Sequence, residues 1–207
     1  EISKSDIEGA LAKFPNPVSS DFATELRIKS KPIVVAANKS DLDSSQQNVE
    51  KMKGSVSAVP TSAEAEITLR KAAEKGMIDY IPGKSFEVTG NLDEKQKHAL
   101  EIIKRKVLDK YGSTGVQDCL NRTVFSVLNC IAVYPVANTN KMSDKDGNVL
   151  PDVHLVPKGT TVRELAFKIH TTLGEKFIAG IDARTKKRLA ADHELENNDV
   201  VEIMFAK

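Results

Sequence analysis

The sequence predicts an α/β protein in three parts, with boundaries near residues 82 and 130. In the first part, apolar runs alternate with helical patterns, which is the order of half of a doubly wound parallel sheet. The second part holds two amphipathic helical patterns, and the third changes to short strands around one helix. The expected domains are therefore residues 1–82, 83–130 and 131–207.

The first part contains the strongest strand signal, which two short helical patterns precede. Pro32–Ala37 is an unbroken apolar run rich in β-branched residues, typical of a strand buried on both faces of a parallel sheet. The polar stretch Asp43–Lys53 predicts a surface helix, and Val56–Val59 predicts a second strand. After Ser62, apolar residues at helical spacing predict a helix that ends at Gly76.

The middle part predicts a helical hairpin. Residues 83–91 are interpreted as the boundary before it. An amphipathic pattern from Ala99 to Tyr111 stops at Gly112, and a second pattern runs over residues 116–128.

The last part has the order of a β-grasp, or ubiquitin-like, fold. Its one long helix begins with the capping box Thr161–Glu164. Strand patterns surround this helix at Val133–Val136, Val153–Val156, Phe177–Ile181, Leu189 and Val200–Phe205. Two strands, one helix and further strands, with the last strand in the centre of the sheet, define this fold.

The composition is that of an ordinary globular protein. The chain has 207 residues and a net charge of +1, so its overall charge does not indicate nucleic acid. No apolar run approaches the ~20 residues of a membrane span, and the histidines and cysteines lack metal-site spacing. The only two cysteines, Cys119 and Cys130, fall in one helical pattern and are expected to be unpaired, as in a reducing compartment. We expect a cytoplasmic monomer with no membrane partner and no metal site.

Asn38-Lys39-Ser40-Asp41 is the most informative motif. It directly follows the predicted strand, at the carboxyl edge where doubly wound folds bind ligands. The Asp41 carboxylate can accept parallel hydrogen bonds from N1–H and the 2-amino group of guanine, which adenine cannot supply. Asn38 can donate toward the base N7, and the Lys39 stem can lie along the ring. The alternative is a strand-to-helix loop in which Asp41 caps the helix.

Thr61-Ser62-Ala63 follows the second predicted strand. In GTPases, a Ser-Ala turn at this place presents a backbone N–H to the guanine O6 and supports the aspartate. Ser62 and Ala63 are therefore candidate base-binding residues. The same residues also fit a helix N-cap, with Glu64 and Glu66 favouring the first turn.

The sequence contains no G-x-x-x-x-G-K-[ST], so no phosphate-binding loop is predicted. Two D-x-x-G strings, Asp109–Gly112 and Asp144–Gly147, follow no buried strand and are interpreted as a helix end and a hairpin turn. No catalytic residue is assigned, and the chain alone is expected to be inactive in GTP hydrolysis.

The only dense basic cluster is Arg184, Lys186, Lys187 and Arg188, four cations in five residues. It predicts a patch that contacts RNA phosphates, or else a solvated hairpin tip.

Together these motifs resemble the Obg-like/YchF-type GTPases, in particular their archaeal branch. The resemblance is carried by Asn38–Asp41, Pro60–Glu66, Gly112–Val116, Val133–Val136, Gly147–Pro151 and Lys158–Thr161. It implies the C-terminal part of a G domain, a helical segment and a TGS domain, with GTP or GDP as ligand and Mg²⁺ in the complete protein. Because Asp41 is kept, the resemblance implies guanine rather than adenine.

Two classes of function stay open. In one, the chain holds the base-recognition edge and effector module of a GTPase switch associated with translation or the ribosome. In the other, it is a stand-alone TGS module that binds RNA or the ribosome, with a non-catalytic scaffold. The start at Glu1, without Met, favours a portion of a longer protein.

Overall fold

The computed structural model describes residues 2–52 and 57–206, so Lys53 and Val56, which the sequence predicted to end a helix and to begin a strand, lie outside the described residues. The chain is a mixed α/β protein with two compact units, Glu1–Thr123 and Val124–Lys207. The three-part division at residues 82 and 130 stays a prediction. Within the described ranges, no helix has the length and apolar character that crossing a membrane requires.

The first unit opens with a helical hairpin of α1 (Lys4–Lys13) and α2 (Ser20–Ser30). Each helix begins at a serine N-cap whose side chain accepts a backbone N–H, which satisfies a donor that the first turn leaves unpaired. An ion pair of 2.7 Å between Lys13 Nζ and Glu25 Oε1 joins the two helices.

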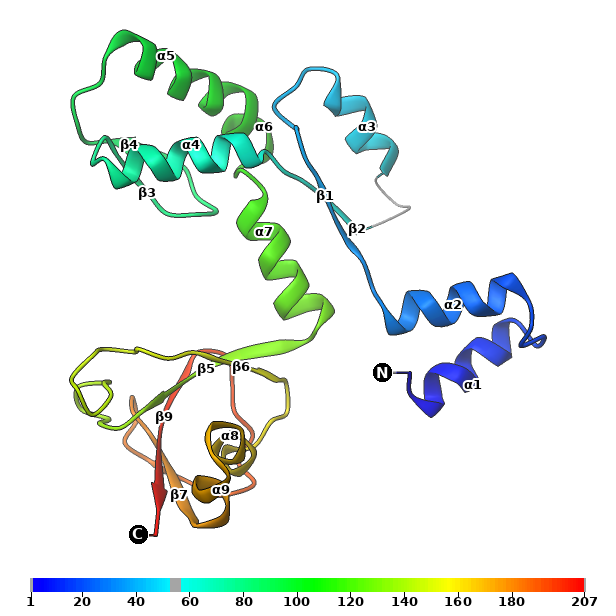
Figure 1. Cartoon of the computed structure of the whole chain (residues 1–207), viewed down its shortest axis with the longest axis vertical. Coiled ribbons are helices and arrows are strands. Elements are labelled where there is room, and N and C mark those ends of the chain that lie inside the picture. Colours follow the sequence, from blue (N-terminus) through cyan, green and yellow to red (C-terminus); the bar gives the residue numbers. More distant parts are fainter. Residues whose placement is uncertain (1, 53–56, 207) are drawn as a thin grey trace. The chain divides into compact units, whose positions relative to one another are not determined.

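A parallel strand pair follows, in the predicted order strand, helix, strand, helix. Its elements are β1 (Val34–Ala37), α3 (Ser45–Met52), β2 (Ser57–Pro60) and α4 (Ala63–Glu74). β1 and β2 lie side by side in Figure 1, with Val34 opposite Ser57 and Ala37 opposite Pro60. The two strands therefore end at the same level, and the loops that follow them are neighbours.

The prediction that β1 is buried on both faces is wrong for the described chain. Only Ala37 of the strand is buried, Ala36 is exposed, and the neighbouring Ile33 is 62% exposed. The physical reason is that β2 is the one strand paired with β1 among the described residues, and a two-stranded sheet leaves an edge and much of its faces uncovered.

A hairpin of β3 (Ile78–Tyr80) and β4 (Phe86–Val88) was not predicted, and β4 lies within residues 83–91, which were interpreted as a boundary. Strands of three residues are too short for an alternating pattern to stand out. In Figure 1 this hairpin lies next to α4. One core cluster joins α4, β3 and the helix that follows, and it includes Leu69, Tyr80, Leu100 and Val107.

The two predicted helices of the middle part are present. The first comprises α5 (Glu94–Ile103), the π-helical segment η1 (Lys104–Leu108) and α6 (Asp109–Tyr111), and it ends at Gly112 with φ 82°. The string Asp109–Gly112 is therefore a helix end, as predicted. The second helix comprises α7 (Val116–Asn121) and the π-helical segment η2 (Arg122–Val127).

Gly115 precedes α7 and packs directly on the end of β2. Its φ is 78°, and a Cβ built on it would lie 1.8 Å from the Pro60 carbonyl oxygen. Any residue but glycine would therefore push the loop 113–115 away from the strand. The Ser62 N–H donates to the Thr114 carbonyl at 2.9 Å, which shows how close the two backbones are.

The second unit is a five-stranded sheet with the strand order β6-β5-β9-β7-β8. Its elements are β5 (Cys130–Val136), β6 (His154–Pro157), α8 (Val162–Ile169), α9 (Thr171–Glu175), β7 (Phe177–Asp182), β8 (Arg188–Leu189) and β9 (Asp199–Phe205). The last strand, β9, is central and parallel to β5, so the β-grasp prediction is confirmed (Figure 1). Thr161 and Glu164 form the predicted capping box at the start of α8.

The placement of the cysteines in one helical pattern is wrong, because Cys130 begins β5. Both thiols are free, and both are half-buried.

Gly115→Ala should destabilise the first unit by more than about 3 kcal/mol, because the added methyl overlaps a backbone oxygen in addition to the strain of positive φ. Gly112→Ala is the matched control. It shares the positive φ but would meet no described heavy atom within 4 Å, so it should cost about 1–2 kcal/mol. Urea unfolding measures both variants, and equal losses would contradict the close approach at Gly115.

Candidate functional site

The two loops that the sequence singled out meet at the carboxyl ends of β1 and β2. The Thr61 N–H donates to the Ala37 carbonyl at 3.0 Å, and the Ser40 N–H donates to the Thr61 carbonyl at 3.0 Å. These hydrogen bonds continue the parallel pairing beyond the strands. Residues 38–41 and 61–63 therefore form one surface at the edge of the sheet, which is where doubly wound folds bind ligands.

Side chains also join the two loops directly. The Ser62 hydroxyl donates to Asp41 Oδ1 at 2.8 Å. Asn38 Oδ1 accepts the Ala63 N–H at 3.1 Å and the Lys39 N–H at 2.8 Å. The structure thus brings together all five residues that the sequence predicted for this site.

Lys39 has a left-handed backbone, with φ 66°. This conformation is uncommon for a residue with a Cβ, and such strained positions cluster at functional sites. The Lys39 side chain is exposed, and its ammonium group has no hydrogen bond or ion pair to any described residue. It is therefore free to lie against a ligand.

The η1 segment lies beside Asp41. A small cavity of ≈150 Å³ lies between them, lined by residues that include Asp41, Ser62 and Val107. An ion pair of 3.2 Å between Lys106 Nζ and Asp43 Oδ2 spans the same two segments. The helix of residues 94–111 therefore contacts the loop after β1 as well as α4.

A buried carboxylate lies behind the site, on the first turn of α4. Glu66 is 4% exposed, and its Oε2 accepts hydrogen bonds from the Tyr80 hydroxyl at 2.6 Å and the Thr114 hydroxyl at 2.5 Å. Its Oε1 accepts the Arg70 Nε–H at 2.6 Å. A buried charge of this kind is stable because it is fully hydrogen-bonded.

These contacts shift the titration of two groups. Burial acts to raise the pKa of Glu66, but the three donors together outweigh it, so the pKa lies below its ordinary value of 4.5. Burial, assisted by the hydrogen bond to Glu66, raises the pKa of Tyr80 to about 12. Glu66 is therefore charged and Tyr80 neutral at pH 7.

This network was not predicted from the sequence pattern. The sequence placed Glu66 in the first turn of a helix, and the structure confirms that place. Its hydrogen bonds with Tyr80 and Thr114 could not be predicted, because both partners come from elements far away in the sequence. The run Ser113-Thr114-Gly115 separated two predicted helices and formed part of the motif Gly112–Val116 that carries the family resemblance, but no contact with Glu66 was predicted for it.

The predicted basic cluster lies in the turn between β7 and β8 of the second unit and includes Arg188, the first residue of β8. Asp182 accepts the backbone N–H groups of Arg184 and Thr185, which fixes the turn. The Arg184 guanidinium donates to the Asn198 carbonyl, and the Lys186 ammonium donates to the Thr139 carbonyl, at 2.8 and 2.7 Å. The charged groups of Lys187 and Arg188 have no partner among the described residues.

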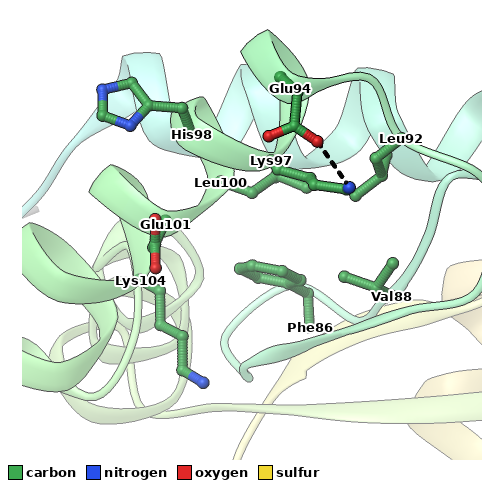
Figure 2. A pocket seen from close by; sticks show the side chains of 9 residues that line it. All are labelled: Phe86, Val88, Leu92, Glu94, Lys97, His98, Leu100, Glu101 and Lys104. Atoms are coloured by element: carbon green, nitrogen blue, oxygen red, sulfur yellow. Dashed lines mark hydrogen bonds and ion pairs between the residues drawn. The ribbon is translucent and has the colours of Figure 1, made fainter.

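A separate pocket of ≈540 Å³ lies between β4 and α5. Figure 2 shows its lining, with Phe86 and Val88 from the strand and the ion-paired Glu94 and Lys97 from the helix. None of the five base-site residues lines it. Its charges alternate in sign, so they favour no particular ligand.

The fold, with two loops joined at the carboxyl edge of a parallel strand pair, is that of the α/β nucleotide-binding class, followed by a β-grasp domain. Comparison with known proteins identifies the family within this class. Residues 36–138 match the family described as "Obg-like GTPase YGR210-like, G4 motif-containing domain", and residues 143–205 match the TGS domain. The chain belongs to the Obg-like GTPase family.

Relatives agree with this placement. A GTP-binding protein of Methanocaldococcus jannaschii is 44% identical over 206 residues, which are 97% of this chain and 52% of that protein. A GTP-binding protein of Schizosaccharomyces pombe is 30% identical over 148 residues, 65% of this chain and 36% of that protein. The crystal structure of a GTP-binding protein from Pyrococcus horikoshii OT3 superposes with a TM-score of 0.67 and 43% sequence identity. The match covers 99% of this chain and 57% of that one. The chain thus spans about half the length of the archaeal relatives that it matches.

Glu66→Gln should lower the free energy of unfolding at pH 7 by about 1–3 kcal/mol, because an uncharged amide accepts the three hydrogen bonds more weakly. Since the folded-state pKa of Glu66 is depressed, its contribution is complete above about 4.5 and is lost as the pH falls through the folded value. The difference between wild type and variant should therefore shrink toward zero in acid.

Glu101→Gln, an exposed substitution on α5, is the control and should change stability by less than about 0.5 kcal/mol at either pH. Urea unfolding at pH 7 and pH 3 measures all three proteins. A pH-independent loss in Glu66→Gln would contradict the charged state.

Proposed function

We propose that this chain recognises the guanine base of GTP or GDP through Asn38, Lys39, Asp41, Ser62 and Ala63. The observation that carries the proposal is the hydrogen bond of 2.8 Å from Ser62 to Asp41 Oδ1. It holds the carboxylate between two loops that leave the ends of paired parallel strands. The names of the relatives, all GTP-binding proteins, support the same ligand.

The chemistry of the loops fits guanine. A carboxylate has about four acceptor positions, so the single bond from Ser62 leaves Asp41 able to accept from N1–H and the 2-amino group. Adenine presents an acceptor at N1 and carries no 2-amino group, so it cannot replace these bonds. The exposed Lys39 stem can lie along the base. The Ala63 N–H, which donates to Asn38 Oδ1 in this structure, lies beside the same place.

Phosphate and Mg²⁺ binding are not assigned to this chain. No group of three or more His, Cys, Asp or Glu side chains in residues 2–52 and 57–206 could hold a metal ion. We propose that GTP hydrolysis and its Mg²⁺, where the longer relatives carry them out, depend on segments outside this match. The chain's own residues bind and orient the base.

We propose, second, that the β7–β8 turn of the TGS domain contacts RNA phosphates, alone or on the ribosome. Lys187 and Arg188 support this best, because their charges have no partner among the described residues. Arg184 and Lys186 belong to the same cluster, but each already donates to a backbone carbonyl.

The two free cysteines further support the proposal of a cytoplasmic protein.

Asp41→Asn should weaken GDP binding by about 2–4 kcal/mol, at least roughly 30-fold, because an amide cannot accept both donors of guanine. The same variant should gain affinity for XDP, since xanthine has a carbonyl where guanine has the 2-amino group and the amide NH₂ can donate to it. NMR titration of the backbone amides measures both ligands. Unchanged GDP affinity would remove residues 38–41 from the site.

Replacing Lys187 and Arg188 with Ala should lower the salt dependence of poly(U) binding by about 1.4 log units per log unit of salt, at about 0.7 for each lost contact. The matched control replaces two exposed lysines of the same unit, Lys158 and Lys176. Fluorescence anisotropy across a salt series compares the proteins. If the two double variants have equal slopes, the cluster is a solvated turn.

A further inference from the structure

We propose that Thr114, held by Glu66, is a positioning residue for guanine recognition, although it lies about fifty positions after the base motifs in the sequence. The inference rests on the base site proposed above and adds a residue that sets its specificity. Thr114 is 0% exposed, so it acts through Ser62 rather than by touching the nucleotide.

The first contact is between backbones. The Thr114 carbonyl accepts the Ser62 N–H at 2.9 Å, directly beside the side chain that holds Asp41. The close approach of Gly115 to the Pro60 carbonyl leaves the loop 113–115 no room to move toward the strand. The position of Ser62 therefore depends on where this loop lies.

The second contact fixes the loop itself. The Thr114 hydroxyl donates to Glu66 Oε2, which the Tyr80 hydroxyl also binds. Glu66 lies four residues after Ser62, and its backbone N–H donates to the Ser62 carbonyl at 3.1 Å. Thr114 thus binds the first turn of α4 twice, once through its carbonyl and once through its hydroxyl.

These contacts bear on Asp41 through one hydroxyl group. The Ser62 Oγ donates to Asp41 and accepts the Ala65 N–H at 3.3 Å, so its direction is set by the backbone of the turn. If the Thr114 hydroxyl is removed, the loop loses its side-chain anchor, and Ser62 can rotate away from Asp41. Both hydrogen bonds that guanine donates to Asp41 should then weaken, because a charged hydrogen bond depends on alignment, and the 2-amino group should contribute less to affinity.

The experiment compares GDP with IDP, whose base lacks only the 2-amino group. NMR titration of backbone amides gives both affinities for each variant. Wild type should prefer GDP by about tenfold or more, the value of one hydrogen bond to a charged group. Thr114→Val should lower this preference below about threefold, because IDP loses one weakened bond and GDP two, and Thr114→Ser, which keeps the hydroxyl, should restore it.

A purely structural role would weaken GDP and IDP equally and leave their ratio unchanged, which would overturn the proposal. Thr123→Val is the matched control, because its hydroxyl binds only the Cys119 carbonyl of its own helix at 2.8 Å. If Thr114→Val does not fold, Tyr80→Phe removes another donor to Glu66, and the same two outcomes apply. A wild type without preference for GDP over IDP would instead overturn the base site itself.

Discussion

The pairing of β1 with β2 is the constraint on which the candidate site depends. Because Ala37 lies opposite Pro60, both strands end together, and the loops after them share two further backbone hydrogen bonds. A shift in this register would separate Asp41 from Ser62. The proposed base recognition depends on ordinary side chains, which the parallel ladder holds within hydrogen-bonding distance of one another.

The helical residues 94–121 extend the same site rather than only following it. They supply Lys106 against Asp43, Thr114 against Ser62 and Glu66, and the glycine that permits the closest backbone approach. Loss of the hydrogen bonds to the buried Glu66 would destabilise this arrangement. A buried carboxylate without hydrogen-bond donors costs the folded state about 3–5 kcal/mol of free energy. The same contacts therefore stabilise the candidate base site and the core of the first unit.

The TGS domain is built on a different principle. Its central strand β9 comes last in the chain, so the sheet is complete only when both ends of the domain have met. The β7–β8 turn at the edge of this sheet is held by Asp182, which accepts two backbone N–H groups of the turn. Two of its four cations are held by carbonyl oxygens, which leaves Lys187 and Arg188 as the available charges.

The sequence by itself determined the order of the longer elements, the β-grasp topology and the five residues that meet at the candidate base site. These follow from local pattern and from the rule that parallel strands end at one edge. The sequence did not determine the β3–β4 hairpin, whose strands are too short for periodicity, or the exposure of β1, which depends on how many strands pair with it. Only the tertiary structure decided that Thr114 and Tyr80 contact Glu66. Contacts between residues far apart in the chain do not change the local sequence pattern, so that pattern cannot predict them.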